Sequence, residues 1–130
     1  MIVVDTNIIA YLWIPGEFTS QAEKAFKKDS DWVAPLLWRS EFRNVLATYL
    51  QRKLMTIDIA LALAKEIESY FRGKEYAVSS EQVLLLAQES SCSAYDCEFV
   101  TLAKDLDLRL LTTDKKILKA FPHIATTPGK

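Results

Sequence analysis

This 130-residue chain has few of the residues that form linkers, disulfides or zinc sites. It contains three glycines, four prolines, two cysteines and one histidine. So little glycine and proline argues against long disordered linkers. A structural zinc site takes about four cysteine or histidine ligands, and Cys92, Cys97 and His123 cannot supply them.

The two cysteines are five residues apart, at Cys92 and Cys97. On a helix, that spacing separates two side chains by roughly 140° around the axis. A local disulfide is therefore not expected. We interpret both cysteines as reduced packing residues, which is typical of a cytoplasmic protein.

Neither sign of charge dominates, because 16 lysines and arginines face 17 acidic residues and give a net charge of −1. A protein that binds nucleic acid through its overall charge would be basic, so any such binding here must use a local patch. The apolar N-terminal segment has no basic region and contains Asp5. Its uninterrupted apolar run, residues 8–14, is shorter than the ~20 residues that span a bilayer. We therefore expect no targeting or membrane segment and a cytoplasmic location.

The chain does contain enough apolar residues for a core, with 50% hydrophobic and 25% charged residues. This length suits one domain, residues 1–130. Strands are predicted at residues 2–4, 32–34, 76–78, 109–112 and 124–126, and helices at 6–12, 20–28, 36–52, 57–72, 79–90, 94–105 and 114–121. This alternation predicts an α/β fold with a central parallel sheet of four to five strands flanked by helices. The two long helices, 36–52 and 57–72, are expected to pack as an antiparallel hairpin.

Helix starts are also readable from the sequence. Ser20 with Glu23, and Ser79 with Gln82, have the spacing of capping boxes, in which each side chain bonds the backbone of the other residue. Thr56 is the expected N-cap of the helix that follows it.

Two aspartates come directly after predicted strands. Asp5 ends the first apolar run, and Asp114 follows the run at 109–112. Open α/β sheets bind their ligands at the carboxyl ends of strands, so both acids are expected at one edge of the sheet. Aspartate is also a favoured helix N-cap, and that structural role remains the alternative for each residue taken alone.

Two further acids interrupt apolar helix faces. Glu41 shares its face with Leu37 and Val45, and Asp96 shares its face with Val100. A carboxylate on such a face costs several kcal/mol unless it is paired or binds a metal. The alternatives are an ion pair with an arginine for Glu41 and a favourable acid in a first helical turn for Asp96.

Together, Asp5, Glu41, Asp96 and Asp114 suggest one acidic site. Carboxylates gathered in one place repel one another strongly, and a hard divalent cation removes that repulsion. Oxygen-only ligands suit Mg²⁺ or Mn²⁺. One or two such ions can activate water and stabilise charge at a phosphate. Spacing alone does not establish that the four side chains meet.

The motifs around these acids resemble those of PIN-domain ribonucleases. VVDTNIIAYLW resembles the opening of these domains, and RSEFRNVL is similar to the segment that carries the family's glutamate. SAYDCEFVTLAKDLDLRLLTTD is similar to the third and fourth acidic motifs with the helix and strand between them. The matching motifs run from residue 2 to about residue 118. The Asp-Thr-Asn opening is common, but four motifs in this order and spacing are specific.

The resemblance implies a metal-dependent endoribonuclease that hydrolyses RNA with activated water and forms no covalent intermediate. It implies that Asp5 and Asp96 ligate the metal directly, and that Glu41 and Asp114 hold a second position or orient water. Thr112 resembles the hydroxyl residue that supports the family's acids. No acid departs from the family pattern.

Supporting and RNA-binding residues are predicted around the acids. Asn7 is expected to hydrogen-bond to Asp5 and fix its rotamer. Arg39 and Arg43 flank Glu41, while Lys115 and Lys116 follow Asp114, so these four are the candidates for phosphate contacts. A solvated surface is the alternative for them.

Two tryptophans are candidates for base stacking or for contact with a protein partner. These are Trp13 and Trp38. Core packing is the alternative for both, and the favoured one for Trp38 because it lies on an apolar helix face.

In its small size, the chain most resembles toxins of VapC type. This resemblance implies RNA as substrate, a cognate antitoxin as partner and a homodimer. The alternatives within the family are an RNA-processing nuclease and a non-catalytic RNA-binding or scaffold PIN domain.

Two other classes of α/β protein are disfavoured. A receiver-type phosphorylation switch needs an acidic pair after the first strand and an aspartate after a central strand, but Asp5 is single and Ser79 follows the predicted third strand. A haloacid-dehalogenase-type phosphatase needs Asp-x-Asp, and Asn7 occupies the position of the second acid.

Overall fold

Short apolar runs form the strands of one parallel sheet. In the computed structural model, which describes residues 1–129, the strand order is β3-β2-β1-β4-β5. The strands are β1 (Ile2–Val4), β2 (Trp32–Pro35), β3 (Glu75–Tyr76), β4 (Leu110–Leu111) and β5 (Ala125–Thr126). The predicted α/β fold with a parallel sheet is confirmed, at the upper end of the expected strand number.

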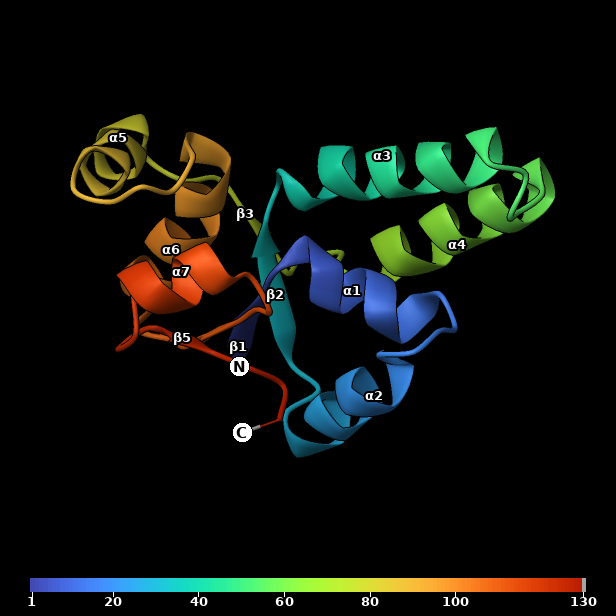
Figure 1. Ribbon diagram of the computed structural model, residues 1–130, viewed down its shortest axis with the longest axis horizontal. Coiled ribbons are helices and arrows are strands. Elements are labelled where there is room, and N and C mark those ends of the chain that lie inside the picture. The colour runs from blue at the N-terminus through green and yellow to red at the C-terminus, as the bar shows by residue number, and fades with distance from the viewer. Residues whose placement is uncertain (130) are drawn as a thin grey trace.

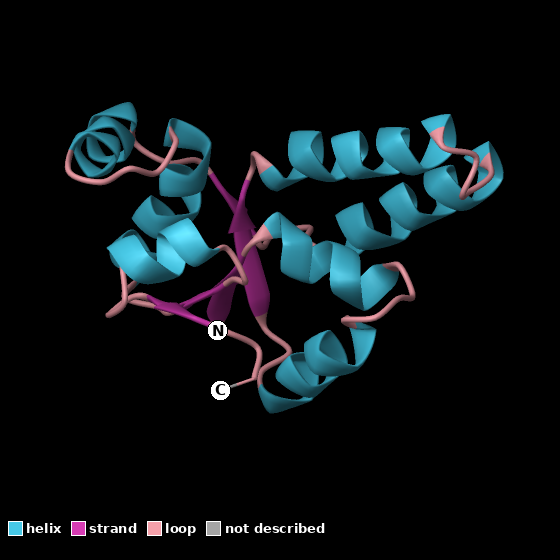
Figure 2. Ribbon diagram, viewed as in Figure 1, coloured by secondary structure: helices cyan, strands magenta, loops and turns pink. Residues whose placement is uncertain are grey.

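Helices cover both faces of this sheet (Figures 1 and 2). They are α1 (Thr6–Trp13), α2 (Thr19–Lys28), α3 (Trp38–Gln51), α4 (Ile57–Tyr70), α5 (Ser80–Gln88), α6 (Ala94–Leu106) and α7 (Lys115–Ala120). Figure 1 shows α1 to α4 on one side and α5 to α7 on the other. Across residues 1–129, no helix is long and apolar enough to cross a membrane.

Strand side chains alternate between two cores, because successive residues of a strand point to opposite faces. In β1, Val3 packs with α5, α6 and α7, whereas Val4 packs with α1, α3 and α4. In β4, Leu110 and Leu111 divide in the same way. A sheet buried on both faces explains why its strands read as continuous apolar runs.

The chain reverses its direction across the sheet at β1. It passes from β1 through β2 to β3 on one side, and later places β4 and β5 on the other. The space between β1 and β4 at their carboxyl ends is therefore a topological switch point, where sheets of this class bind ligands. Asp5 follows β1, and Asp114 follows β4.

The two long helices form the predicted antiparallel hairpin (Figure 1). Trp38 and Phe42 of α3 pack against each other, and Trp38 also contacts Phe71 at the end of α4. Trp38 is 1% exposed, and Trp13 packs against the rings of Trp32 and Phe71. Both tryptophans are therefore engaged in packing and are poorly placed to stack on bases.

An ion-pair network ties the start of α3 to β3. Glu75 accepts hydrogen bonds from Trp38 Nε1 at 2.6 Å and from Arg39 Nε at 2.6 Å. Arg39 also donates to Glu68 on α4 at 3.0 Å. The Arg39 guanidinium beside Glu75 lowers the pKa of that carboxyl below its ordinary value.

Helix starts only partly match their predicted caps. Thr56 caps α4, and the Ser79 hydroxyl accepts from Gln82 N. The Ser20–Glu23 box is wrong, because α2 begins one residue earlier with Phe18 at its N-cap and no side-chain cap. The hydroxyl of Thr19 instead accepts from Gly16 N and donates to Tyr11 O, which holds the turn before the helix.

The cysteines are free and buried, in agreement with the prediction. Cys92 immediately precedes Ser93, the N-cap of α6, and Cys97 is the fourth residue of that helix. Apolar residues at these two positions commonly pack together and fix the entry of a chain into its helix.

We predict that Glu75→Ala lowers the free energy of unfolding by roughly 2–3 kcal/mol, because it leaves the Trp38 indole N–H without its acceptor and leaves the Arg39 guanidinium with Glu68 alone. The matched control is Glu68→Ala, which removes the more exposed partner of Arg39 and should cost less than about 1 kcal/mol. Urea unfolding followed by circular dichroism measures both. Equal losses in the two variants would contradict this account.

Candidate active site

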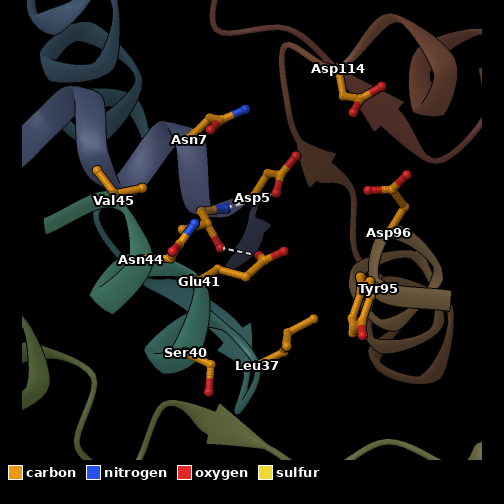
Figure 3. Close-up of a pocket in the computed structure, with 11 residues that line it drawn as sticks. Asp5, Asn7, Leu37, Ser40, Glu41, Asn44, Val45, Tyr95, Asp96 and Asp114 are labelled. Atoms are coloured by element: carbon orange, nitrogen blue, oxygen red, sulfur yellow. Dashed lines mark hydrogen bonds between the residues drawn. The ribbon is translucent and has the colours of Figure 1, made fainter. Parts of the chain in front are cut away.

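A pocket of about 610 Å³ lies at the switch point and is lined by all four predicted acids. Figure 3 shows the carboxyl groups of Asp5, Glu41 and Asp96 around a common space, with Asp114 at its rim. They come from the ends of β1 and β4 and from α3 and α6. Among the residues that line the pocket, none is a lysine, arginine or histidine. The acids therefore face one another without a protein cation inside the pocket.

Asp5 is the most constrained of the four. It is the N-cap of α1, with Oδ1 accepting from Thr6 N at 2.8 Å. Oδ2 accepts from the Thr112 hydroxyl at 2.7 Å. The hydrogen bond predicted from Asn7 is not formed in the described chain, where Thr6 and Thr112 hold the Asp5 carboxylate, although Asn7 lines the same pocket.

Thr112 joins the two strand ends. It is fully buried, and its hydroxyl donates to Asp5 while accepting from Asp114 N at 3.0 Å. A single hydroxyl therefore fixes the carboxylate after β1 and the backbone after β4. Asp114 in turn caps α7, with Oδ1 accepting from Lys116 N at 2.8 Å and from Ile117 N at 3.3 Å.

Glu41 is held by a residue that the sequence analysis did not single out. The hydroxyl of Thr6, which is 4% exposed, donates to Glu41 Oε1 at 2.6 Å. This bond takes the place of the arginine pairing considered as an alternative for Glu41. Thr6 thus gives its backbone N–H to Asp5 and its hydroxyl to Glu41, and the Asp-Thr-Asn opening was the available signal for it.

Asp96 occupies the third position of α6 and closes a capping box with Ser93. Asp96 N donates to Ser93 Oγ at 3.1 Å, and Ser93 N donates to Asp96 Oδ2 at 3.4 Å. The helix-capping alternatives are therefore real for Asp5, Asp96 and Asp114. Capping and a place in the pocket coexist, because an ionised carboxylate offers about four acceptor positions.

Burial and mutual charge disfavour ionisation of the two innermost acids. Burial raises the pKa of Asp5 to about 6, although hydrogen bonds from Thr112 and Thr6 oppose the change, and the charges of Glu41 and Asp96 add to it. Burial, with a smaller contribution from Asp96, also raises the pKa of Glu41. Above pH 6, the folded protein carries an ionised Asp5 in surroundings that favour the neutral form, which costs stability.

A divalent cation fits this donor set chemically. Within residues 1–129, Asp96 Oδ1, Asp114 Oδ2 and Glu41 Oε2 have no hydrogen-bond partner, so each remains free to act as a ligand. All donors are oxygen, which suits a hard cation such as Mg²⁺ or Mn²⁺. In the described chain, however, no three acidic side chains lie close enough together to ligate one ion as they stand. Binding therefore requires the carboxylates to draw inward.

The four predicted phosphate-binding cations lie outside the pocket lining. Arg39 is engaged by Glu75 and Glu68, which makes a phosphate contact near the acids an unfavourable role for it. Arg43, Lys115 and Lys116 are exposed, and their contact with RNA stays a prediction. The pocket also contains exposed residues that the sequence analysis passed over, among them Asn44 and Tyr95.

Comparisons with known proteins agree with this architecture. The PIN domain family model matches residues 2–123. Ribonuclease VapC3 from Pyrobaculum aerophilum is 30% identical over 128 residues, which is 96% of this chain and 98% of that protein.

Two solved structures share the fold. FitAcB from Neisseria gonorrhoeae gives a TM-score of 0.76 at 19% identity, and the match covers 99% of each chain. A toxin–antitoxin complex from Klebsiella pneumoniae gives a TM-score of 0.72 at 18% identity, and the match covers 98% of each chain. With the family model and the VapC3 relative, these findings show that the chain belongs to the PIN domain family.

Proposed function

We propose that this chain is an endoribonuclease that depends on Mg²⁺ or Mn²⁺ and cleaves RNA phosphodiester bonds. The observation that carries the proposal is the pocket into which four carboxylates project without a lysine, arginine or histidine in its lining. The relative named ribonuclease VapC3 supports the same reaction. The pocket lining contains no histidine, so it holds no pair of a side-chain nucleophile and a histidine base.

Asp5 and Asp96 are proposed as the direct ligands of one ion, with Glu41 and Asp114 completing the site or binding a second ion. Bound there, the cation would supply Lewis acidity that activates water and offsets charge at the phosphate. The chain's own part is positional. Thr112 and Thr6 hold the orientations of Asp5 and Glu41, so that two of the four carboxylates are oriented by their neighbours before the set draws inward around an ion.

We further propose that the protein is the toxin of a toxin–antitoxin pair and is controlled by a partner protein. The support is the structural similarity to a chain of the Klebsiella pneumoniae toxin–antitoxin complex. Exposed apolar side chains at the tip of the α3–α4 hairpin, such as Leu54, Ile57 and Leu61, offer surface for such a partner. The homodimer expected from the family stays a prediction.

Cleavage is the first test. The purified protein should cut a structured RNA mixture with Mg²⁺ or Mn²⁺ and stop with a chelator. Asp5→Asn should lower the rate by more than the roughly 10- to 100-fold typical of changing a residue that supports metal ligands. Asp58→Asn, an exposed acid in the first turn of α4, is the control and should cleave normally. Cleavage indifferent to metal and to Asp5 would sink the proposal, and absent cleavage would favour a binding-only PIN domain.

Thermal unfolding tests the metal site separately from catalysis. Mn²⁺ should raise the melting temperature of the wild-type protein, because an ion that binds only the folded state stabilises it by about 2.7 kcal/mol at 100 times its Kd. Asp96→Asn should reduce the increase, whereas Asp58→Asn should preserve it. If Mn²⁺ changes the melting temperature of neither the wild type nor Asp96→Asn, the acids do not form a metal site.

Thr6 is predicted to act as a positioning residue for Glu41. Thr6→Val keeps the shape but removes the hydroxyl donor at 2.6 Å, and we expect a roughly 10- to 100-fold loss of kcat. Thr6→Ser retains the donor and should recover most of the activity. Single-turnover rates, with melting temperatures measured in parallel, check this. Equal activity of Thr6→Val and Thr6→Ser would assign Thr6 to packing alone.

A further inference from the structure

Tyr95 is an aromatic residue left exposed beside the acids. It lies in the first turn of α6, directly before Asp96, and lines the same pocket as the four carboxylates. Its exposed fraction is 63%. Within residues 1–129 its ring makes no hydrogen bond and no aromatic or cation–π contact. Trp13 and Trp38, by contrast, pack against other rings, so Tyr95 is the aromatic side chain available at the pocket.

The opposite wall of the pocket is suited to an uncharged group. Around Glu41, apolar surface comes from Leu37 just before α3 and from Val45 on α3, while Ser40 and Asn44 are exposed residues with a hydroxyl and an amide. Figure 3 shows Tyr95 on the α6 side of the space, with Leu37, which directly precedes α3, across from it. One wall therefore offers a π-face, and the other offers apolar contact with hydrogen-bonding groups.

An RNA strand has two parts that a pocket of this kind treats differently. The acids repel phosphates unless a cation intervenes. A nucleobase carries no charge, has a π-face that stacks on aromatic side chains, and has edges that bond amides and hydroxyls. The face of a base is available for such stacking only when the base is unstacked from its neighbours, as in single-stranded loops and ends.

We propose that Tyr95 is a stacking platform for one unpaired base beside the phosphate that is cut. This inference rests on the proposed nuclease function for the position of the cut. Tyr95 binds substrate through its ring, so its contribution lies in affinity and not in the chemical step.

The test compares two RNA chains of equal charge. A fluorescein-labelled oligoadenylate 12-mer and an abasic ribose-phosphate 12-mer are titrated with the wild-type protein in Ca²⁺, and a gel confirms that the RNA stays intact. Fluorescence anisotropy then gives Kd for the wild type, Tyr95→Ala, Tyr95→Phe and Leu84→Ala. Leu84 is the matched control, since it is also 63% exposed but lies on α5 outside the acidic pocket.

Wild type should bind oligoadenylate more tightly than the abasic chain. Tyr95→Ala should weaken oligoadenylate binding roughly tenfold and leave the abasic chain almost unaffected, so that the discrimination disappears. Tyr95→Phe keeps a ring and should restore most of it, while Leu84→Ala should match the wild type. Circular dichroism confirms that each variant is folded.

Failure of this inference is separable from failure of the nuclease. If metal-dependent cleavage is present but Tyr95→Ala still discriminates as the wild type does, Tyr95 is not a base platform, although the nuclease stands. Loss of discrimination in Tyr95→Ala without any cleavage by the wild type would keep the platform and overturn the enzyme. Equal binding of both RNA chains by the wild type would also overturn the inference.

Discussion

Parallel pairing of β1 with β2 and β4 is the constraint on which the rest of the molecule depends. Because parallel strands run in one direction, their carboxyl ends meet at one edge of the sheet. The residues after β1 and β4 are adjacent for that reason alone, and Thr112 makes the adjacency specific by bonding both Asp5 and the backbone of Asp114. The helices on the two faces then bring Glu41 and Asp96 to the same edge.

Like charges can gather at this edge because helix N-termini are directed there. Asp5 caps α1, Asp96 lies in the capping box of α6, and Asp114 caps α7. Each N-terminus carries partial positive charge and unpaired N–H groups, which stabilise a nearby carboxylate. This compensation is incomplete, since burial still raises the pKa of Asp5 to about 6. The residual strain is what a bound cation would relieve.

The sequence was sufficient for the succession of strands and helices along the chain and for the four acids that line the pocket, because both follow from strong local signals. Buried parallel strands are continuous apolar runs, and Glu41 and Asp96 stand out as acids on apolar helix faces. The errors came from contacts between distant segments. The Ser20–Glu23 spacing matched a capping box, but the bonds of Thr19 to Gly16 and Tyr11 set the start of α2. Arg39 was predicted to contact phosphate, but in the folded chain it pairs with Glu75 of β3. No local pattern marked Tyr95 as exposed.

The double use of aspartate at the helix starts has an evolutionary consequence. Asparagine caps a helix about as well as aspartate, so a change from Asp to Asn at positions 5 or 114 removes a negative charge from the pocket while leaving an acceptor for the helix N–H groups. One substitution in a descendant gene would thus remove one of the four carboxylates from the pocket while the gene still encodes a folded domain. Relatives without the proposed nuclease activity would then be expected to retain the fold and to differ first at these two positions.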